Sequence, residues 1–448
     1  MWEKIIMLFV ENLYSLEYYV TSVGAVLQEN MRKTFEENEN VAQLLNSVLK
    51  EVEFEQIYEN ENEPSILEMA SEEGLIEGEI IDADEYHHND GFDGERIHVK
   101  IARNSKNELV SMKFENMTQE TGDKFSRFFK SMNYMNKSNG ILYEGSLISL
   151  VIYFETLITD ILKEVYMKSG DGLIENHSLT FREIKELGGI EDAINYLTEK
   201  EIMGLMYKGF EEWCKYLKNK LNLDLDYLGK TQDDIIEIIN RRNLYVHNRG
   251  IVNKTYLSRV SSKYNECTEL GEKLIIDEKY IEDSISIIEE FGVMLVCENW
   301  IKEFRGNTEE YDSMSEVMFY FMDKEKWKLV SKMNELVLNK GSKYINQKQK
   351  MICKINYWQS MKWQDSYESI REEVEKEDTS ALTKDFQLCI HALNENYELF
   401  FAILEEAFET DINEHELESW PIFKEIRKMD QYKKFRDDKG ISIGNDVK

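Results

Sequence analysis

Proline is almost absent from this chain of 448 residues, in which Pro64 and Pro421 are the only examples. Proline interrupts a helix because it lacks a backbone donor and its ring clashes with the preceding turn, so a chain without it can form long helices. Apolar residues make up 42% of the sequence, which is enough to bury a core. The sequence therefore predicts a folded, mainly α protein, and its length is typical of about three domains.

The first region, residues 1–140, is expected to be an acidic α+β region. Apolar residues at helical spacing run through residues 1–60. The segment ERIHVKIARNSKNELVSMKFEN (95–116) then alternates apolar and polar residues on both sides of a polar turn, which predicts a β-hairpin. The acidic segment DADEYHHNDGFDGE (82–95) before it is expected to form a loop.

The second region, residues 141–305, is expected to be a compact bundle of about five or six helices. Residues 141–169 are apolar nearly all round at their start, as in the central helix of a bundle. Thr180 is followed three residues later by Glu183, which predicts a capping box at a helix start. A long helix over about 278–304 is expected to close this region.

The third region, residues 306–448, is also expected to be helical. Short polar joins between helices are typical of stacked antiparallel pairs, as in tetratricopeptide-type solenoids. No clean signature of a repeat of roughly 34 residues is present in the sequence. The candidate helices span 312–323, 325–338, 342–360, 363–375, 380–393 and 395–408, and a terminal helix is expected to begin at Pro421.

Charge is distributed very unevenly along the chain. With 87 acidic and 54 basic side chains, the net charge is −33, and this total counts against nucleic-acid binding, which usually needs a basic face. Residues 36–95 contain twenty acidic residues and a single base, Lys50, whereas residues 238–265 contain six basic residues and no acid. An anionic ligand is therefore expected at 238–265.

Cysteine usage and hydropathy indicate the compartment. The five cysteines are widely spaced without a CxxC pair, which argues against a disulfide framework or a cysteine-rich zinc site and is typical of a reducing cytosol. The N-terminal apolar run 5–10 is too short for a signal peptide or a membrane span, so we expect a cytoplasmic protein that contacts no membrane.

His87 and His88 lie among acidic residues, but such clusters are usually solvated, and no metal or other cofactor is expected.

The string RRNLYVHNRG (241–250) forms the C-terminal end of an expected helix, which Thr231 is expected to cap and which meets Gly250 at its end. A histidine such as His247 can move a proton to or from a ribose 2′-hydroxyl. An arginine such as Arg242 offers permanently charged donors to a phosphate or to its pentavalent transition state. Asn243 lies one helical turn before His247, where it can orient the imidazole or contact the phosphate. These residue types suffice for RNA cleavage without a metal.

The spacing of Arg242 and His247 adds a geometric condition. Five residues correspond to about 140° around an ideal helix, so one helix does not present the two side chains as neighbours. Two copies that face each other across a two-fold axis would bring them together. Arg241, Arg249 and Lys254 are candidates to hold the RNA backbone, and each is equally expected as a solvated surface charge.

The longer string RRNLYVHNRGIVNKTYL (241–257) resembles the signature of the HEPN superfamily (higher eukaryotes and prokaryotes nucleotide-binding). The ribonuclease pattern of that superfamily is an arginine, a polar residue, three to five further residues and a histidine. Arg242, Asn243 and His247 match it in this sequence. Residues 141–305 also resemble HEPN domains of bacterial phage-defence and abortive-infection proteins.

The resemblance implies a metal-independent endoribonuclease that leaves 2′,3′-cyclic phosphate and 5′-hydroxyl ends. In that role His247 is the general base or acid, Arg242 stabilises the phosphate and its transition state, and Asn243 orients the imidazole. The resemblance also implies a homodimer with a composite site, RNA such as tRNA or mRNA as the substrate, and a function in antiphage defence or as a toxin. A protein regulator or antitoxin is a further partner that it suggests.

Three alternatives stay open at this point. Residues 241–250 are also what an ordinary helix end looks like, because positive charge there is favourable against the helix dipole. A HEPN domain can instead be a non-catalytic dimerisation or sensor scaffold that binds a protein partner. The acidic stretch 36–95 is either a solvated segment or an anionic surface that competes with RNA for residues 238–265. Tyr245 is expected more as a core or interface residue than as a base-stacking one.

Overall fold

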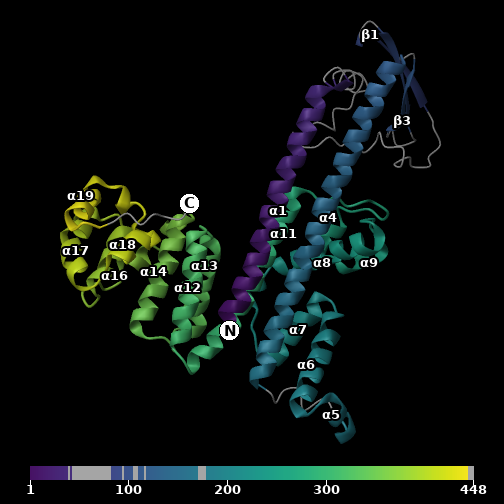
Figure 1. The fold of residues 1–448 in the computed structure, drawn as a ribbon. Coiled ribbons are helices and arrows are strands. Elements are labelled where there is room, and N and C mark those ends of the chain that lie inside the picture. Colours follow the sequence, from purple (N-terminus) through teal and green to yellow (C-terminus); the bar gives the residue numbers. More distant parts are fainter. Residues whose placement is uncertain are drawn as a thin grey trace. The chain divides into compact units, whose positions relative to one another are not determined.

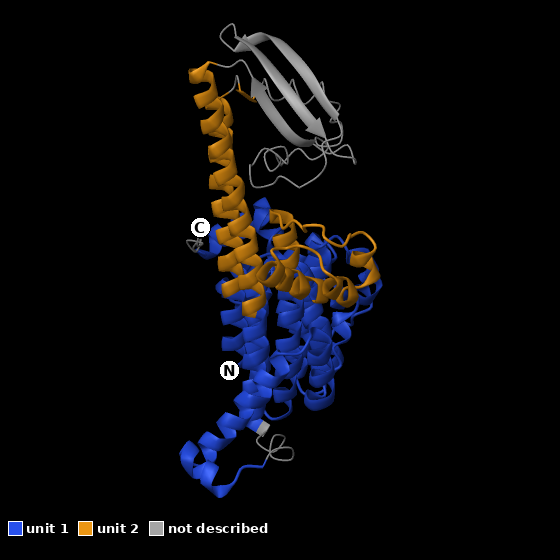
Figure 2. Cartoon of the chain, turned by 90° about the vertical axis from the view of Figure 1, so that its right-hand side faces the viewer, with its two compact units in different colours: residues 1–11, 154–235, 286–448 blue, residues 12–153, 236–285 orange. Residues whose placement is uncertain are grey.

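The computed structural model describes residues 1–38, 41–42, 82–92, 95–103, 109–115, 118–169 and 178–441 (Figure 1). Within residues 82–115 it describes the backbone and not the side chains. Contacts divide the chain into two compact units, neither of which is continuous in sequence (Figure 2). Unit 1 consists of residues 1–11, 154–235 and 286–448, and unit 2 consists of residues 12–153 and 236–285. The division into 1–140, 141–305 and 306–448, which follows composition rather than contacts, stays a prediction.

Helices make up most of the described chain, so the protein is mainly α, as the scarcity of proline predicts. Four helices contribute residues to both units: α1 (Trp2–Glu37), α4 (Gln119–Ser169), α8 (Thr231–Asn248) and α11 (Glu278–Trp300). The remaining α-helices of unit 1 are, in chain order, α5 (Phe181–Leu187), α6 (Ile190–Met206), α7 (Phe210–Leu221), α12 (Glu309–Asp323), α13 (Trp327–Leu336), α14 (Gln347–Trp363), α15 (Arg371–Glu375), α16 (Lys384–Leu393), α17 (Tyr397–Thr410), α18 (Glu414–Ser419) and α19 (Asp430–Lys439).

Short helical turns complete unit 1: the 3₁₀ turns η1 (Asp226–Leu228), η2 (Ile301–Arg305), η4 (Tyr367–Ser369), η5 (Pro421–Phe423) and η6 (Ile426–Lys428), and the π-helical turn η3 (Val337–Gly341). Unit 2 adds the short helices α9 (Lys254–Arg259) and α10 (Ser262–Asn265) and the strands β1 (Asp82–Phe92), β2 (Glu95–Arg103) and β3 (Leu109–Glu115).

The three strands of unit 2 form one antiparallel sheet in the order β1-β2-β3. Strands β2 and β3 pair with Ile101 opposite Met112, on both sides of the polar segment 104–108, which lies outside the described residues. The alternating pattern predicts this pair. The loop expected over 82–95 is wrong, because β1 pairs along β2 in this segment. An acidic, polar segment can serve as an edge strand since it is paired on one side only.

In unit 2, the long helices α1 and α4 pack against each other in opposite directions. Phe35, near the end of α1, contacts Phe128, near the start of α4, with ring centroids 5.5 Å apart. Gly24, earlier in α1, lies close to Tyr143, later in α4. By length and composition, α4 is the one helix among the described residues that is apolar enough to cross a membrane, and half of its apolar window is buried in the fold.

In unit 1, the helix boundaries follow local signals in the sequence. The capping box between Thr180 and Glu183 is confirmed at the start of α5, and Gly188 ends this helix with a φ of 109°. Further along, α13 packs against α14 and α16 packs against α17, as expected for helical pairs. The single helix expected over 363–375 is wrong. Asp365 takes a left-handed φ of 57°, which ends α14 and leaves only the short η4 and α15 beyond it.

The core of unit 1 contains a close helix crossing at Gly292 of α11. A Cβ built on Gly292 would lie 2.6 Å from Cε1 of Phe9 and 2.7 Å from Cδ2 of Leu157. Real Cβ atoms do not approach this closely, so α11 depends on a glycine here. Gly204 of α6 is a matched control, since nothing lies within 4 Å of its Cβ position.

We predict that Gly292→Ala and Gly204→Ala have opposite effects on the free energy of unfolding. Alanine is the better helix former by about 1 kcal/mol, so Gly204→Ala should stabilise the protein by up to that amount. Gly292→Ala should destabilise it by about 1–3 kcal/mol, because the added methyl group overpacks the core. Chemical denaturation of both variants checks this, and a stabilised Gly292→Ala variant would contradict the packing described.

Candidate functional site

Helix α8 ends in a left-handed turn that fixes the position of its last side chains. Arg249 and Gly250 have φ values of 56° and 79°, and the Gly250 N–H donates to the Leu244 carbonyl at 3.2 Å. A residue in the left-handed conformation is a common end for an α-helix. The sequence predicts a helix that Thr231 caps, with Asp233 and Asp234 in its first turn and Gly250 at its end. The structure confirms the helix over Thr231–Asn248, but Thr231 is its first residue rather than its cap, and its hydroxyl donates to the Leu228 carbonyl. His247 therefore lies in the last turn of α8.

The segment after α8 is held by backbone pairing with a later loop. Ile251 forms an isolated antiparallel bridge with Lys273, and the Val252 N–H donates to the Glu272 carbonyl at 2.8 Å. Helix α9 then starts at an Asn253 cap, whose side chain accepts the Tyr256 N–H at 2.9 Å. Below these turns lies a small apolar core made of Leu244, Val252, Tyr256, Val260 and Leu274.

Tyr245 packs beneath the turn that ends α8. Its hydroxyl donates to the Leu274 carbonyl, and the side chain is half-buried. A Cβ on Gly250 would lie 2.8 Å from Cζ of the Tyr245 ring. The ring therefore needs a glycine above it, and this placement favours the structural role expected for Tyr245 over base stacking.

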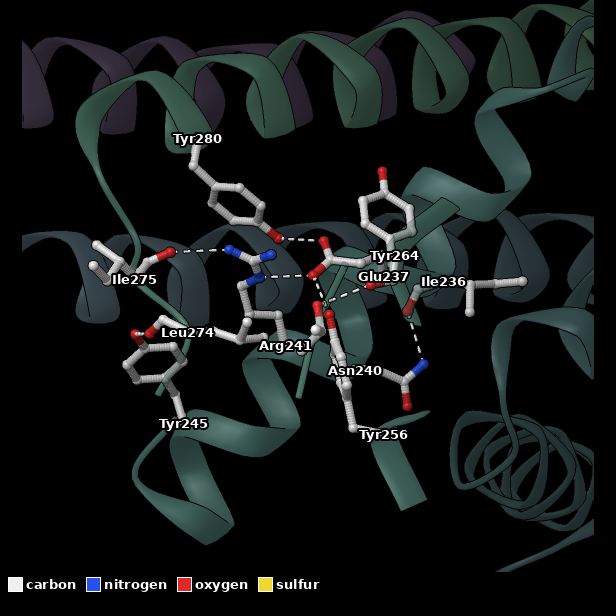
Figure 3. A network of polar contacts seen from close by, with 11 residues as sticks. Ile236, Glu237, Asn240, Arg241, Tyr245, Tyr256, Tyr264, Leu274, Ile275 and Tyr280 are labelled. Carbon is white, nitrogen blue, oxygen red and sulfur yellow. Dashed lines mark hydrogen bonds and ion pairs between the residues drawn. The ribbon is translucent and has the colours of Figure 1, made fainter. Parts of the chain in front are cut away.

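Arg241 is engaged within the protein, as Figure 3 shows. Its Nε donates to the Glu237 carboxylate at 2.6 Å, and its Nη1 donates to the Ile275 carbonyl at 2.9 Å. The guanidinium also lies 4.1 Å from the centroid of the Tyr280 ring, within range of a cation–π interaction. Arg241 can contact RNA only by giving up some of these bonds, so its assignment to RNA binding stays a prediction.

The Glu237 side chain is only 1% exposed, and its carboxylate accepts hydrogen bonds from three side chains. In addition to Arg241, the hydroxyls of Tyr256 and Tyr280 each donate to it at 2.7 Å (Figure 3). Burial raises the pKa of both tyrosines, and the neighbouring carboxylate raises it further, so both hydroxyls keep their protons at neutral pH. We call Glu237, Arg241, Tyr256 and Tyr280 the Glu237 cluster.

Burial and the ion pair act in opposite directions on Arg241. Burial lowers the pKa of its guanidinium, but the interactions with Tyr280 and Glu237 outweigh burial and leave the pKa above its usual value. Arg241 therefore keeps its positive charge. Removal of one partner from a buried pair of this kind leaves an uncompensated charge, which costs about 3–5 kcal/mol.

The residues assigned to catalysis lie beyond this cluster on α8. Arg242 and Asn243 are half-buried, whereas His247 is exposed. Because α8 continues to Asn248 without a break, Arg242 and His247 keep the angular separation of about 140° that five helical residues impose. A single copy thus places the two side chains on different faces of the helix.

The exposed basic residues continue past the helix. Arg249 follows α8, Lys254 begins α9, and Arg259 ends it, all three with exposed side chains. Lys263 of α10 is also exposed. In this part of unit 2 the basic segment stays acid-free up to Glu266. An anion at this end of α8 would therefore meet several cations and no carboxylate of the same segment.

Three members of the Glu237 cluster were not expected from the sequence. Glu237 lies four residues before Arg241, a spacing at which side chains meet on a helix, and this signal could have identified the pair. Tyr256 and Tyr280 lie 19 and 43 residues from Glu237, so a local sequence pattern could not predict their contacts with it.

Neither a metal centre nor a relative identifies this site. Among the described residues, no group of three or more His, Cys, Asp or Glu is placed to hold a metal ion. The side chains of His87 and His88 lie outside that description. Comparison with protein-family models, curated proteins and solved structures found no match for this chain.

We predict that Gly250→Ala destabilises the protein more than Gly271→Ala does. Both glycines have a positive φ, of 79° and 90°, so alanine is strained at both positions. Only Gly250 also lies against a ring, that of Tyr245, and nothing lies within 4 Å of the Cβ position at Gly271. We expect a loss of about 1 kcal/mol for Gly271→Ala and about 1–3 kcal/mol more for Gly250→Ala. Equal losses in thermal denaturation would show that the Tyr245 contact contributes nothing.

Proposed function

We propose that this chain is a metal-independent endoribonuclease with its reactive groups on helix α8. The observation that carries the proposal is the exposure of His247 in the last turn of that helix, directly before an exposed basic and acid-free segment. A histidine of this kind has access to a polyanion, and the neighbouring Arg249 and Lys254 can hold its phosphates. The resemblance of residues 241–257 to HEPN ribonucleases supports the same chemistry.

The proposed reaction needs only groups that protein side chains supply. His247 accepts the proton of a ribose 2′-hydroxyl, whose oxygen attacks the adjacent phosphorus. The P–O5′ bond breaks, and the leaving oxygen takes a proton from a general acid, so the products are a 2′,3′-cyclic phosphate and a 5′-hydroxyl. Arg242 stabilises the charge on the pentavalent phosphorane, and Asn243 orients the imidazole.

The proposed site is completed by a second copy of the chain. Since Arg242 and His247 diverge by about 140° on one helix, we place Arg242 of one copy beside His247 of the other. Three exposed apolar side chains next to the motif can form the contact between copies. These are Val246, Ile251 and Ile275, which are 49%, 40% and 64% exposed.

The same apolar side chains favour a second candidate function. A scaffold that dimerises or binds a protein partner would also present Val246, Ile251 and Ile275, and would have no need of His247. The two functions therefore differ in the residues on which they depend. Antiphage defence, a toxin role and a protein regulator belong to either proposal and follow from the resemblance alone.

We predict that His247→Ala strongly slows cleavage of total bacterial RNA. Loss of a general acid or base should lower the rate by about 10²–10⁴-fold, and EDTA should leave the wild-type rate unchanged. The matched control is His415→Ala, since His415 is an exposed histidine of unit 1 and should be dispensable. Mass spectrometry should find cyclic phosphates at the new ends.

Two outcomes would contradict this function. A His247→Ala variant as active as His415→Ala would remove the proposed base, and inhibition of the wild type by EDTA would require a metal. RNA that stays intact with every variant, together with a dimer that is lost on Ile275→Glu, would instead favour the scaffold.

A further inference from the structure

The Glu237 cluster joins three helices of unit 2 at one carboxylate. Glu237 and Arg241 belong to α8, Tyr256 belongs to α9, and Tyr280 belongs to α11. The two tyrosines reach different oxygens of the carboxylate, since Tyr256 donates to Oε1 and Tyr280 donates to Oε2. Both oxygens of Glu237 are therefore held, and each donor comes from a different helix.

This arrangement constrains rotation of α8 about its own axis. Glu237 and Arg241 are one turn apart on the same face of the helix, and both are anchored outside α8, Glu237 by Tyr256 and Tyr280 and Arg241 by Ile275. Any rotation of α8 would stretch bonds of 2.7 Å to Tyr256 and Tyr280 and the 2.9 Å bond from Arg241 to Ile275. Arg242 is the next residue, and His247 follows within two turns.

A buried ion pair is not needed for stability alone. Apolar residues of similar volume often replace such a pair without loss, because the charges pay a large desolvation penalty. What a carboxylate with three directed donors adds is a defined geometry, since hydrogen bonds weaken steeply when their angles change. Catalytic groups need such support, because small misplacements of reacting groups reduce rates strongly.

We propose that Glu237 is a positioning residue that, through Arg241, Tyr256 and Tyr280, sets the rotation of α8 and so the placement of Arg242 and His247. This inference rests on the proposed ribonuclease function for its kinetic readout. It assigns different tasks to two adjacent arginines: Arg241 holds the helix, and Arg242 meets the phosphate.

The test compares Glu237→Gln and Tyr280→Phe with a buried carboxylate elsewhere. The control is Glu298→Gln in unit 1, because Glu298 is also buried and also accepts from a tyrosine and a cation, Tyr227 at 3.0 Å and Lys340 at 2.5 Å. Tyr280→Phe removes a single hydroxyl and keeps the ring beside Arg241, so it serves if Glu237→Gln does not fold.

The expected kinetic result separates positioning from general stability. At saturating RNA, Glu237→Gln should lower the cleavage rate by about tenfold to a hundredfold, while RNA affinity changes by less than about threefold. On the residual cleavage rate of an Arg242→Ala background the same substitution should have a smaller effect than in the wild-type background, because only His247 is left to place. The proposal is overturned if the loss is the same in both backgrounds, or if Glu298→Gln loses as much.

Hydrogen exchange decides the question independently of RNA cleavage. Glu237→Gln and Tyr280→Phe should speed amide exchange in residues 242–253 and leave the core helices of unit 1 unchanged, whereas Glu298→Gln should not affect residues 242–253. Unchanged exchange in 242–253 overturns the positioning role. If the wild type cleaves no RNA but exchange responds as expected, the ribonuclease function falls and the control of α8 by Glu237 stands.

Discussion

The buried carboxylate of Glu237 is the interaction on which the arrangement of the site depends. It lies inside unit 2 and accepts hydrogen bonds from donors on α8, α9 and α11. A carboxylate in this position without any partner would be strongly unfavourable, so these donors favour the packing of the three helices around it. The hydrogen bonds of Glu237 therefore also position the end of α8, which carries Arg242 and His247.

A second constraint comes from the end of the helix itself. Arg249 and Gly250 turn the chain back over Tyr245, and backbone pairing of 250–252 with 271–274 closes the loop. The turn exposes His247 and starts the basic segment of α9 and α10. Exposure of a proton-transfer group beside cations that can bind phosphate is what the proposed RNA cleavage requires, and the diverging directions of Arg242 and His247 are why the proposal includes two copies.

Local signals in the sequence predict local structure well here. The scarcity of proline indicates long helices, the Thr180–Glu183 pattern predicts a cap, and Gly250 predicts the end of α8. Some errors arise where distant contacts decide. Residues 82–92 form a strand because β2 pairs with them. The Glu237 cluster is the same case, since its tyrosines come from distant parts of the chain. The end of α14 at Asp365 is a local feature that the sequence analysis missed, since aspartate is one of the residues that adopt a left-handed φ.

The central claim is that Arg242 of one copy works with His247 of another, and a mixing experiment tests it most directly. Arg242→Ala and His247→Ala should each cleave RNA at only a small residual rate alone, because every site in either homodimer lacks one essential group. Mixed under conditions that allow subunits to exchange, they form heterodimers that contain one intact Arg242 and one intact His247. The account predicts that the mixture recovers RNA cleavage well above either variant alone. A mixture that exchanges subunits and stays as inactive as its components, beside an active wild type, would contradict it.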